Sequence, residues 1–249
     1  MKILKFKKKP NGKYSVYLDD GREFVYYEET ILQYELLIKR EIDEKDLLTI
    51  HQTNLEYDVY YVALNSIKSR FKSVYELREF LRKKEYPEEM IDKAIDKLID
   101  QRYLDDRLFA KSYINTQMIT TSHGPLRIKN DLYNKKVPSY IIEEEIALFD
   151  EDSQIEKMKK IIERLIRSNR TRGGLVLKQK IINDLKTQGY EYDLISRIIS
   201  SYSFPQDKNL AKKEYDKLYK KYSTKYEGYE LAIKIREKMF QKGLTYEEE

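Results

Sequence analysis

The chain has 249 residues, of which 37% are charged and 41% hydrophobic, and its 48 Lys and Arg exceed its 43 Asp and Glu by a net charge of +5. Zero Cys excludes internal disulfides, thiol nucleophiles and zinc–cysteine sites, and the two His residues, His51 and His123, are too far apart in sequence for a local metal pair. The sequence contains no run of about 18 apolar residues, so no membrane-spanning helix is predicted. We therefore expect a soluble, cytoplasmic protein without metal or other cofactor.

The first 27 residues are rich in strand-forming side chains. Three segments favour strands, residues 3–6, 14–18 and 23–27, and the turn signals Pro10-Asn11-Gly12 and Asp19-Asp20-Gly21 separate them. This pattern predicts a small three-stranded meander. We place it in an N-terminal segment, residues 1–50, together with one short helix.

From about residue 29 onward the apolar pattern is helical and it repeats. The anchors Leu81, Leu132, Leu185 and Met239 are 51, 53 and 54 residues apart. Ten and fourteen positions after each of the first three anchors comes an Ile: Ile91 and Ile95, Ile142 and Ile146, Ile195 and Ile199. Three helices of roughly 10 to 14 residues with short loops would fill such a period.

This repeat predicts a mainly α protein, an elongated row of three-helix modules behind the small β meander. The expected modules are residues 51–104, 105–156 and 157–204, followed by an incomplete fourth at 205–249 whose third helix is missing. Asp105 and Asp106 are expected to cap a helix, and Gly124-Pro125 to end one helix and begin the next.

The charge is unevenly distributed along these modules. Residues 1–50 and 51–104 are each neutral, residues 105–156 hold six basic and ten acidic side chains, and residues 157–204 hold eleven and four. Between positions 157 and 180, nine basic residues accompany a single acid, Glu163. The nine are Lys157, Lys159, Lys160, Arg164, Arg167, Arg170, Arg172, Lys178 and Lys180.

Helical spacing places Lys160, Arg164 and Arg167 on one face, opposite Met158, Ile161 and Leu165. Arg170 and Arg172 are expected in a mobile turn with Gly173-Gly174. Such a cluster suits a nucleic-acid backbone or an acidic protein groove, and a merely solubilising face is the alternative. Weaker candidates are Arg127, Lys135 and Lys136, although cations at the C-terminal end of a helix are also favoured by the helix dipole.

The second module carries a pattern that resembles a known family. It reads Leu104-Asp105-Asp106-Arg107-Leu108-Phe109-Ala110, then Gly124-Pro125-Leu126-Arg127-Ile128, Asp131-Leu132 and Pro138, and the first module adds Ser73, Glu76, Leu77 and Leu81. This is similar to the RecX family, regulatory proteins that act on the RecA recombinase, in its longer form with an N-terminal β extension. The resemblance covers Ala63 to Thr245. Lys136-Val137 replaces the usual Lys-Gly, and Gly173-Gly174 stands where the second module has Gly-Pro.

The resemblance implies a monomeric regulator that lies along the RecA filament on DNA. It would modulate ATP hydrolysis, filament growth and strand exchange, with inhibition as the favoured sign, and the basic third module could also contact single- or double-stranded DNA. Two alternatives remain open, a sequence-independent nucleic-acid binder and a helical adaptor for another protein. No catalytic constellation is found, so an enzyme, with Asp105 or Asp106 as its carboxylates, is the least favoured reading.

Overall fold

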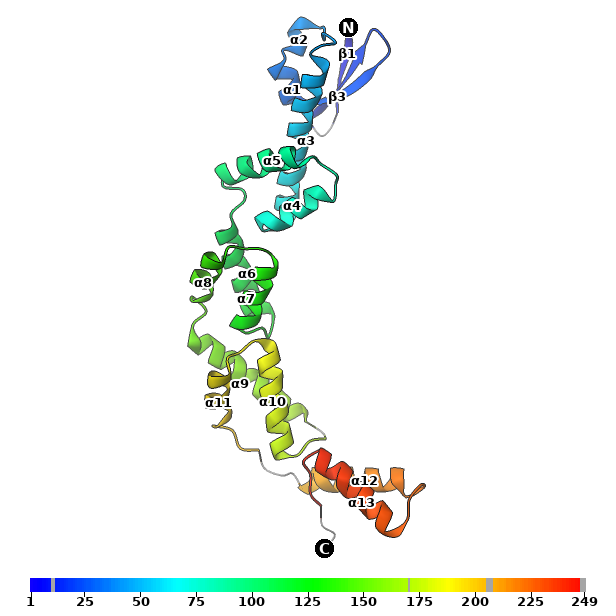
Figure 1. Ribbon diagram of the computed structural model, residues 1–249, viewed down its shortest axis with the longest axis vertical. Coiled ribbons are helices and arrows are strands. Elements are labelled where there is room, and N and C mark those ends of the chain that lie inside the picture. The colour runs from blue at the N-terminus through cyan, green and yellow to red at the C-terminus, as the bar shows by residue number, and fades with distance from the viewer. Residues whose placement is uncertain (10–11, 170, 205–207, 247–249) are drawn as a thin grey trace. The chain divides into compact units, whose positions relative to one another are not determined.

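The computed structural model describes residues 1–9, 12–169, 171–204 and 208–246 (Figure 1). The chain forms two compact units. The first holds Met1–Phe109 together with Lys135–Pro138, and the second holds Ala110–Asn134 and the chain from Ser139 onward. No helix in these described ranges is long and apolar enough to cross a membrane.

The first unit begins with the predicted three-stranded sheet. Its antiparallel strands are β1 (Ile3–Lys8), β2 (Lys13–Leu18) and β3 (Glu23–Tyr27), in the order β1-β2-β3. The meander is therefore confirmed, and of its first turn Pro10 and Asn11 lie outside the described residues. Two short helices follow instead of the expected one, α1 (Glu28–Gln33) and α2 (Leu36–Lys39), because Glu35 adopts a left-handed backbone with φ of 53° between them.

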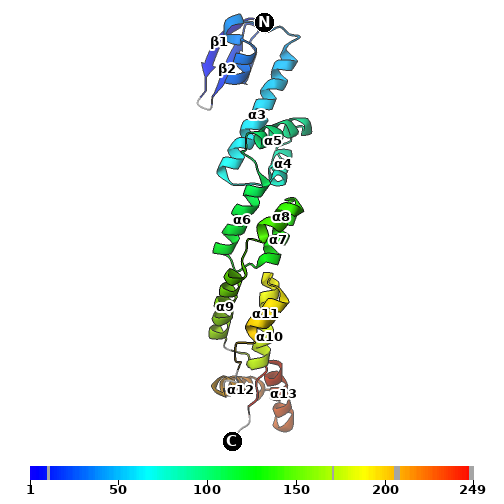
Figure 2. The same cartoon turned by 90° about the vertical axis from the view of Figure 1, so that its left-hand side faces the viewer.

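The sheet lies against the N-terminal half of α3 (Leu47–Ser69), as Figure 2 shows from the side. Asp58 of α3 connects the two layers. Its carboxylate accepts hydrogen bonds from Lys13 Nζ at 2.9 Å, Tyr27 Oη at 2.8 Å and Tyr86 Oη at 2.6 Å. Burial alone would raise the pKa of Asp58, but these three donors and the Lys13 charge hold it below its ordinary value.

Replacing Asp58 with Asn is expected to lower the free energy of unfolding by about 2 kcal/mol near neutral pH, because the buried donors lose a charged acceptor. Since the folded-state pKa is depressed, this contribution is present above the ordinary pKa of 3.8 and is lost as the pH falls through the lower folded value. Urea unfolding near neutral pH and at about pH 3 should show the difference between Asp58→Asn and the native chain shrinking in acid. The exposed Asp96→Asn is the control, expected within about 0.5 kcal/mol, and an equal loss in both variants would contradict the assignment.

The remaining helices follow the predicted repeat. In chain order they are α4 (Val74–Arg82), α5 (Glu88–Asp100), α6 (Asp106–Thr120), α7 (Pro125–Asn134), α8 (Ser139–Ile146), α9 (Glu151–Ser168), α10 (Gly174–Gln188), α11 (Tyr192–Ile199), α12 (Lys208–Tyr222) and α13 (Gly228–Gln241). The mainly α fold with its small N-terminal sheet is confirmed. Helix lengths vary more than the repeat suggests, from 23 residues in α3 to 8 in α8 and α11.

The spacing of the anchors has a packing explanation. Leu81, Leu132 and Leu185 are fully buried, and Met239 is 3% exposed, because each faces the core from the second helix of its group. The Ile residues ten positions after the first three anchors are also fully buried. We propose that α3–α5, α6–α8, α9–α11 and α12–α13 correspond to the modules at 51–104, 105–156, 157–204 and 205–249.

The two aspartates of the second module accept N–H groups at the starts of different helices. Asp105 accepts the backbone N–H groups of Arg107 at 2.7 Å and Leu108 at 3.1 Å, which confirms its role at the start of α6. Asp106 instead accepts the N–H of Val74 at 2.9 Å, the first residue of α4. Burial raises the pKa of Asp106, which that N–H partly counters.

In the first three modules, the start of the second helix contacts the end of the second helix in the following module. The Ser73 hydroxyl donates to the Lys135 carbonyl at 2.9 Å, the Gly124 N–H to Gln188 at 2.7 Å and the Gly173 N–H to Lys242 at 2.7 Å. At Gly124 and Gly173 the two backbone segments approach so closely that an added Cβ would overlap the facing segment. A Cβ on Gly124 would lie only 2.6 Å from the Gly189 carbonyl oxygen. We call these three contacts the junctions.

The third junction overturns one expectation. The turn containing Gly173-Gly174 is not a free, mobile loop, because both glycines are buried. Gly173 packs against Gly243, and a Cβ on Gly174 would overlap the carbonyl oxygen of Phe204. Asn169 is joined to Arg172, donating to its carbonyl at 2.7 Å and accepting its N–H at 3.1 Å. Arg170 lies outside the described residues.

Candidate partner-binding surface

Three basic residues of α9 lie on one exposed face, as their spacing predicts. Lys160, Arg164 and Arg167 are exposed, while Met158 and Ile161 of the same helix are buried in the core. Asp150 begins this helix, since its carboxylate accepts the Ser153 N–H at 2.7 Å. The hydrophobic stripe of α9 therefore fixes the direction in which its cations point.

Three of these cations share a surface depression with the connection between α6 and α7. Lys157, Lys160 and Arg164 line it together with Thr121 and Ser122, in a volume of about 240 Å³. We call this set the basic depression. It combines three positive side chains with two hydroxyl-bearing residues, which is the chemistry that binds phosphate or carboxylate oxygens.

The cations of the basic depression are poorly compensated. Lys157 donates to the Gln117 carbonyl at 3.4 Å and lies 5.7 Å from the Phe149 ring centroid. Burial lowers its pKa. Lys160 has only an exposed ion pair with Glu156 at 3.7 Å, and no described carboxylate lies within ion-pair distance of Arg164. A negatively charged partner would therefore meet cations with little internal neutralisation.

The pKa of the neighbouring His123 is lowered, first by burial and then by nearby cations. Burial lowers this pKa most, and the charges of Arg127 and Lys157 lower it further. The charge of Asp131 partly offsets these effects. The Nδ1 of His123 is buried without a hydrogen-bond partner among the described residues. Burial and these charges therefore disfavour the protonated form of the imidazole.

The other residues of the predicted basic segment form a separate group. Arg172 and Lys180 line a second depression of about 180 Å³ with Ser168, Asn169 and Thr171. Lys180 forms an ion pair with Asp184 on the next turn of α10, and Lys178 is half-buried on the same helix. The structure thus splits the run from 157 to 180 into two clusters.

The weaker candidates near α7 have different environments. Arg127 is half-buried in the first turn of α7, beside Gly189, and Lys136 is exposed with a left-handed φ of 55°. Lys135 forms an ion pair with Glu76 in which both side chains are about four-fifths buried, and its Nζ lies 5.8 Å from the Phe109 ring. The Lys135 charge is therefore engaged within the first unit, at the first junction.

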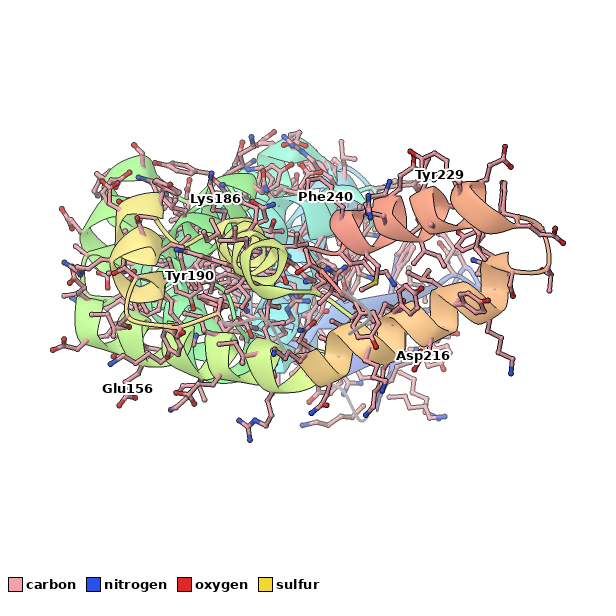
Figure 3. All side chains as sticks on the ribbon, turned by 90° about the horizontal axis from the view of Figure 1, so that it is seen from below. Glu156, Lys186, Tyr190, Asp216, Tyr229 and Phe240 are labelled. Carbon is pink, nitrogen blue, oxygen red and sulfur yellow. The ribbon has the colours of Figure 1, made fainter. Side chains whose placement is uncertain are left out.

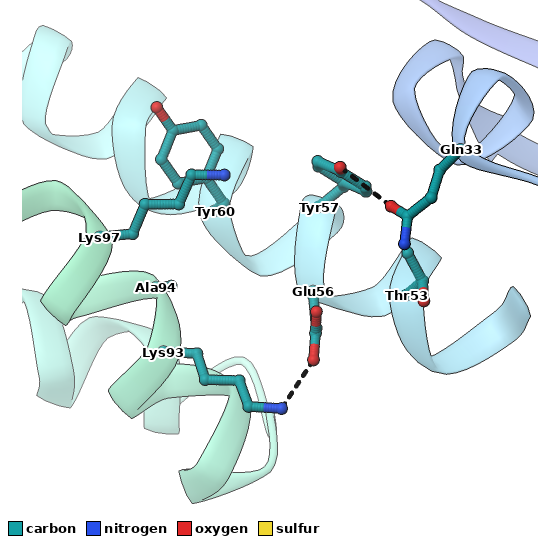
Figure 4. A pocket seen from close by; sticks show the side chains of 8 residues that line it. All are labelled: Gln33, Thr53, Glu56, Tyr57, Tyr60, Lys93, Ala94 and Lys97. Carbon is teal, nitrogen blue, oxygen red and sulfur yellow. Dashed lines mark hydrogen bonds and ion pairs between the residues drawn. The ribbon is translucent and has the colours of Figure 1, made fainter. Parts of the chain in front are cut away.

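The first unit also contains a polar depression, of about 120 Å³, between α1, α3 and α5 (Figure 4). Its charged groups are already satisfied. Lys93 contacts Glu56 at 2.7 Å, Lys97 lies 4.5 Å from the Tyr60 ring centroid, and Tyr57 donates to Gln33 at 3.3 Å. In the described ranges no His, Asp and Glu side chains gather as a metal site.

Sequence reasoning missed Thr121 and Ser122. They stand about forty positions before Lys160 in an unremarkable polar connection, and only the packing of α6 and α9 brings them to the basic depression. No local spacing rule would have paired them with the cations.

Comparison with known proteins places the chain in a family. The sequence model described as RecX, first three-helix domain, matches residues 60–98, and the one described as RecX, second three-helix domain, matches residues 105–146. The crystal structure of RecX from Lactobacillus salivarius is 30% identical, with a TM-score of 0.56, and the match covers 59% of this chain and 96% of that one. The chain belongs to the RecX family.

Two further similarities extend over more of the chain. A crystal structure named regulatory protein RecX has a TM-score of 0.69 at 27% identity, covering 80% of this chain and 99% of that one. The regulatory protein RecX of Halalkalibacterium halodurans is 29% identical over 98% of this chain and 95% of its own length. That of Bacillus subtilis is 27% identical over 96% and 91%. These RecX names support a regulatory role.

Proposed function

We propose that this RecX protein binds the RecA recombinase filament on DNA and inhibits its ATP hydrolysis, filament growth and strand exchange. Membership of the RecX family is the observation that carries the proposal. It acts by contact rather than by chemistry, as a monomer, and belongs to DNA repair and recombination.

The helical modules suit a repeated partner. Each module presents a similar set of helices, so several modules can each contact a subunit, and weak contacts combine through effective concentration. We assign the basic depression, Lys157, Lys160 and Arg164, as the main contact, with Arg167, Arg172, Lys178 and Lys180 beside it. Its positive charge speeds the encounter with an acidic protein groove or with the DNA backbone and makes binding sensitive to salt.

Hydrolysis of ATP by RecA on single-stranded DNA tests the proposal, because a filament-binding inhibitor lowers it in proportion to the filament occupied. Retention on the same DNA without recombinase separates this role from direct nucleic-acid binding, which would show an equally steep salt dependence on bare DNA. Equal retention on bare DNA and on filaments, without any change in hydrolysis, would contradict the proposal.

A further inference from the structure

The described residues of the fourth module leave an apolar groove open beside α13. No described residue forms a helix after α13, and the groove there has a volume of about 550 Å³. Ile235, Met239 and Leu244 form its floor and are almost fully buried, whereas Phe240 at its edge is 79% exposed. Phe240 therefore extends the apolar surface of the groove at its edge.

The position of Phe240 is a contact point for the third helix in the other modules. It directly follows the anchor Met239, as Arg82, Tyr133 and Lys186 follow the first three anchors. Each of those three contacts the third helix of its own module: Arg82 bonds Glu88 of α5, Tyr133 donates to Glu143 of α8 at 2.9 Å, and Lys186 lies 5.0 Å from the Tyr192 ring of α11. Figure 3 labels Lys186 on α10 and Phe240 on α13.

Arg236 indicates the charge of an occupant of the groove. It stands three positions before its anchor, like Arg78 and Lys129 in the first two modules. Arg78 pairs with Asp92 of α5, and Lys129 pairs with Glu143 of α8, both at 2.5 Å. Arg236 lines the groove, and no described carboxylate lies within ion-pair distance of it.

We propose that this groove binds an acidic amphipathic helix of a partner protein. The helices that fill the equivalent place in the first two modules supply the pattern, an Ile followed directly by a carboxylate and then by an Ile four positions after the first: Ile91, Asp92 and Ile95 in α5, and Ile142, Glu143 and Ile146 in α8. The two Ile residues cover the floor, and the carboxylate meets Arg236.

Charge complementarity supports an acidic occupant. Arg236 is the only charged side chain among the described residues that line the groove. The helices α5 and α8 are acidic, with five acids against two bases and three against none. This surface is separate from the basic depression, so the inference extends beyond the proposed function and does not rest on it.

The test uses the full chain and a fluorescent peptide with the sequence of residues 87–101, which carries the α5 pattern. Fluorescence anisotropy is expected to show saturable binding, with a dissociation constant of about 10–100 µM. Arg236→Glu should weaken binding about tenfold, since it places like charges together. A peptide carrying Asp92→Lys should restore binding to that variant. Phe240→Lys, which introduces the residue type that Lys186 supplies in the third module, should also weaken binding of the unmodified peptide.

Lys213→Glu is the matched control, because it makes the same charge change on an exposed part of α12 away from the groove. Circular dichroism of each variant checks the helical content. Absence of peptide binding, or an equal loss in Arg236→Glu and Lys213→Glu, would overturn the proposal. Sedimentation of the free chain tests the other occupant, since a dimer that Phe240→Lys dissociates would assign the groove to a second copy and also overturn it.

Discussion

Gly173→Ala is expected to destabilise the second unit by about 3 kcal/mol, because a well-packed contact cannot accept the added methyl group. Gly173 has φ of −82° and ψ of 168°, so alanine adopts its backbone without strain. The cost therefore comes from packing alone. The methyl would overlap the Gly243 carbonyl oxygen and lie 3.0 Å from Leu244 Cδ2, and it would separate the Gly173 N–H from Lys242.

Urea unfolding followed by circular dichroism measures this loss, and hydrogen exchange locates it. Protection of the Gly173 amide should fall most, since its hydrogen bond spans the third junction. Gly228→Ala is the control: its φ is 53° and no atom lies within 4 Å of the added Cβ, so only backbone strain of about 1 kcal/mol is expected. Similar costs for the two substitutions would contradict the close packing of this junction.

Lys160→Glu combined with Arg164→Glu is expected to raise the concentration needed for half-maximal inhibition of the RecA filament about 30-fold at low salt, at roughly 1 kcal/mol for each reversed side chain. Both side chains are exposed on α9 and line the basic depression, so neither substitution disturbs the core. The difference from the native chain should shrink as salt rises, because the charges are screened.

A double variant with the same change in net charge provides the comparison. Lys159 and Lys213 are exposed and lie outside the basic depression. Lys159→Glu combined with Lys213→Glu should therefore change inhibition less than about threefold. If both double variants lose inhibition equally, net charge and not the basic depression carries the contact.

The sequence predicted the buried anchors because their signal lies in the spacing along the chain. Leu81, Leu132 and Leu185 recur at nearly constant spacing, and each must face a core, so burial selects the same residue type at each repeat. The exposed face of α9 could also be predicted, because helical periodicity directs Lys160 and Arg164 away from the buried side.

Contacts between modules could not be predicted in this way. Gly124 meets Gly189 and Lys135 meets Glu76 across about sixty positions, and no periodic pattern pairs such residues. Asp106 looked like a cap for its own helix, yet its carboxylate accepts the N–H of Val74 in α4, because the two residues meet only after the helices pack. The prediction of a mobile turn at Gly173-Gly174 was wrong for the same reason, because glycine is used where backbones approach closely as well as where the chain is flexible.

The rate of ATP hydrolysis by RecA on single-stranded DNA, measured with increasing amounts of this protein, tests the central claim most directly. Hydrolysis is expected to fall at amounts well below one copy per RecA subunit, because several modules of one chain are proposed to engage the filament. Lys160→Glu with Arg164→Glu is also expected to shift the curve to higher concentrations. An unchanged rate at equimolar protein, with a correctly folded chain, would contradict the proposed function.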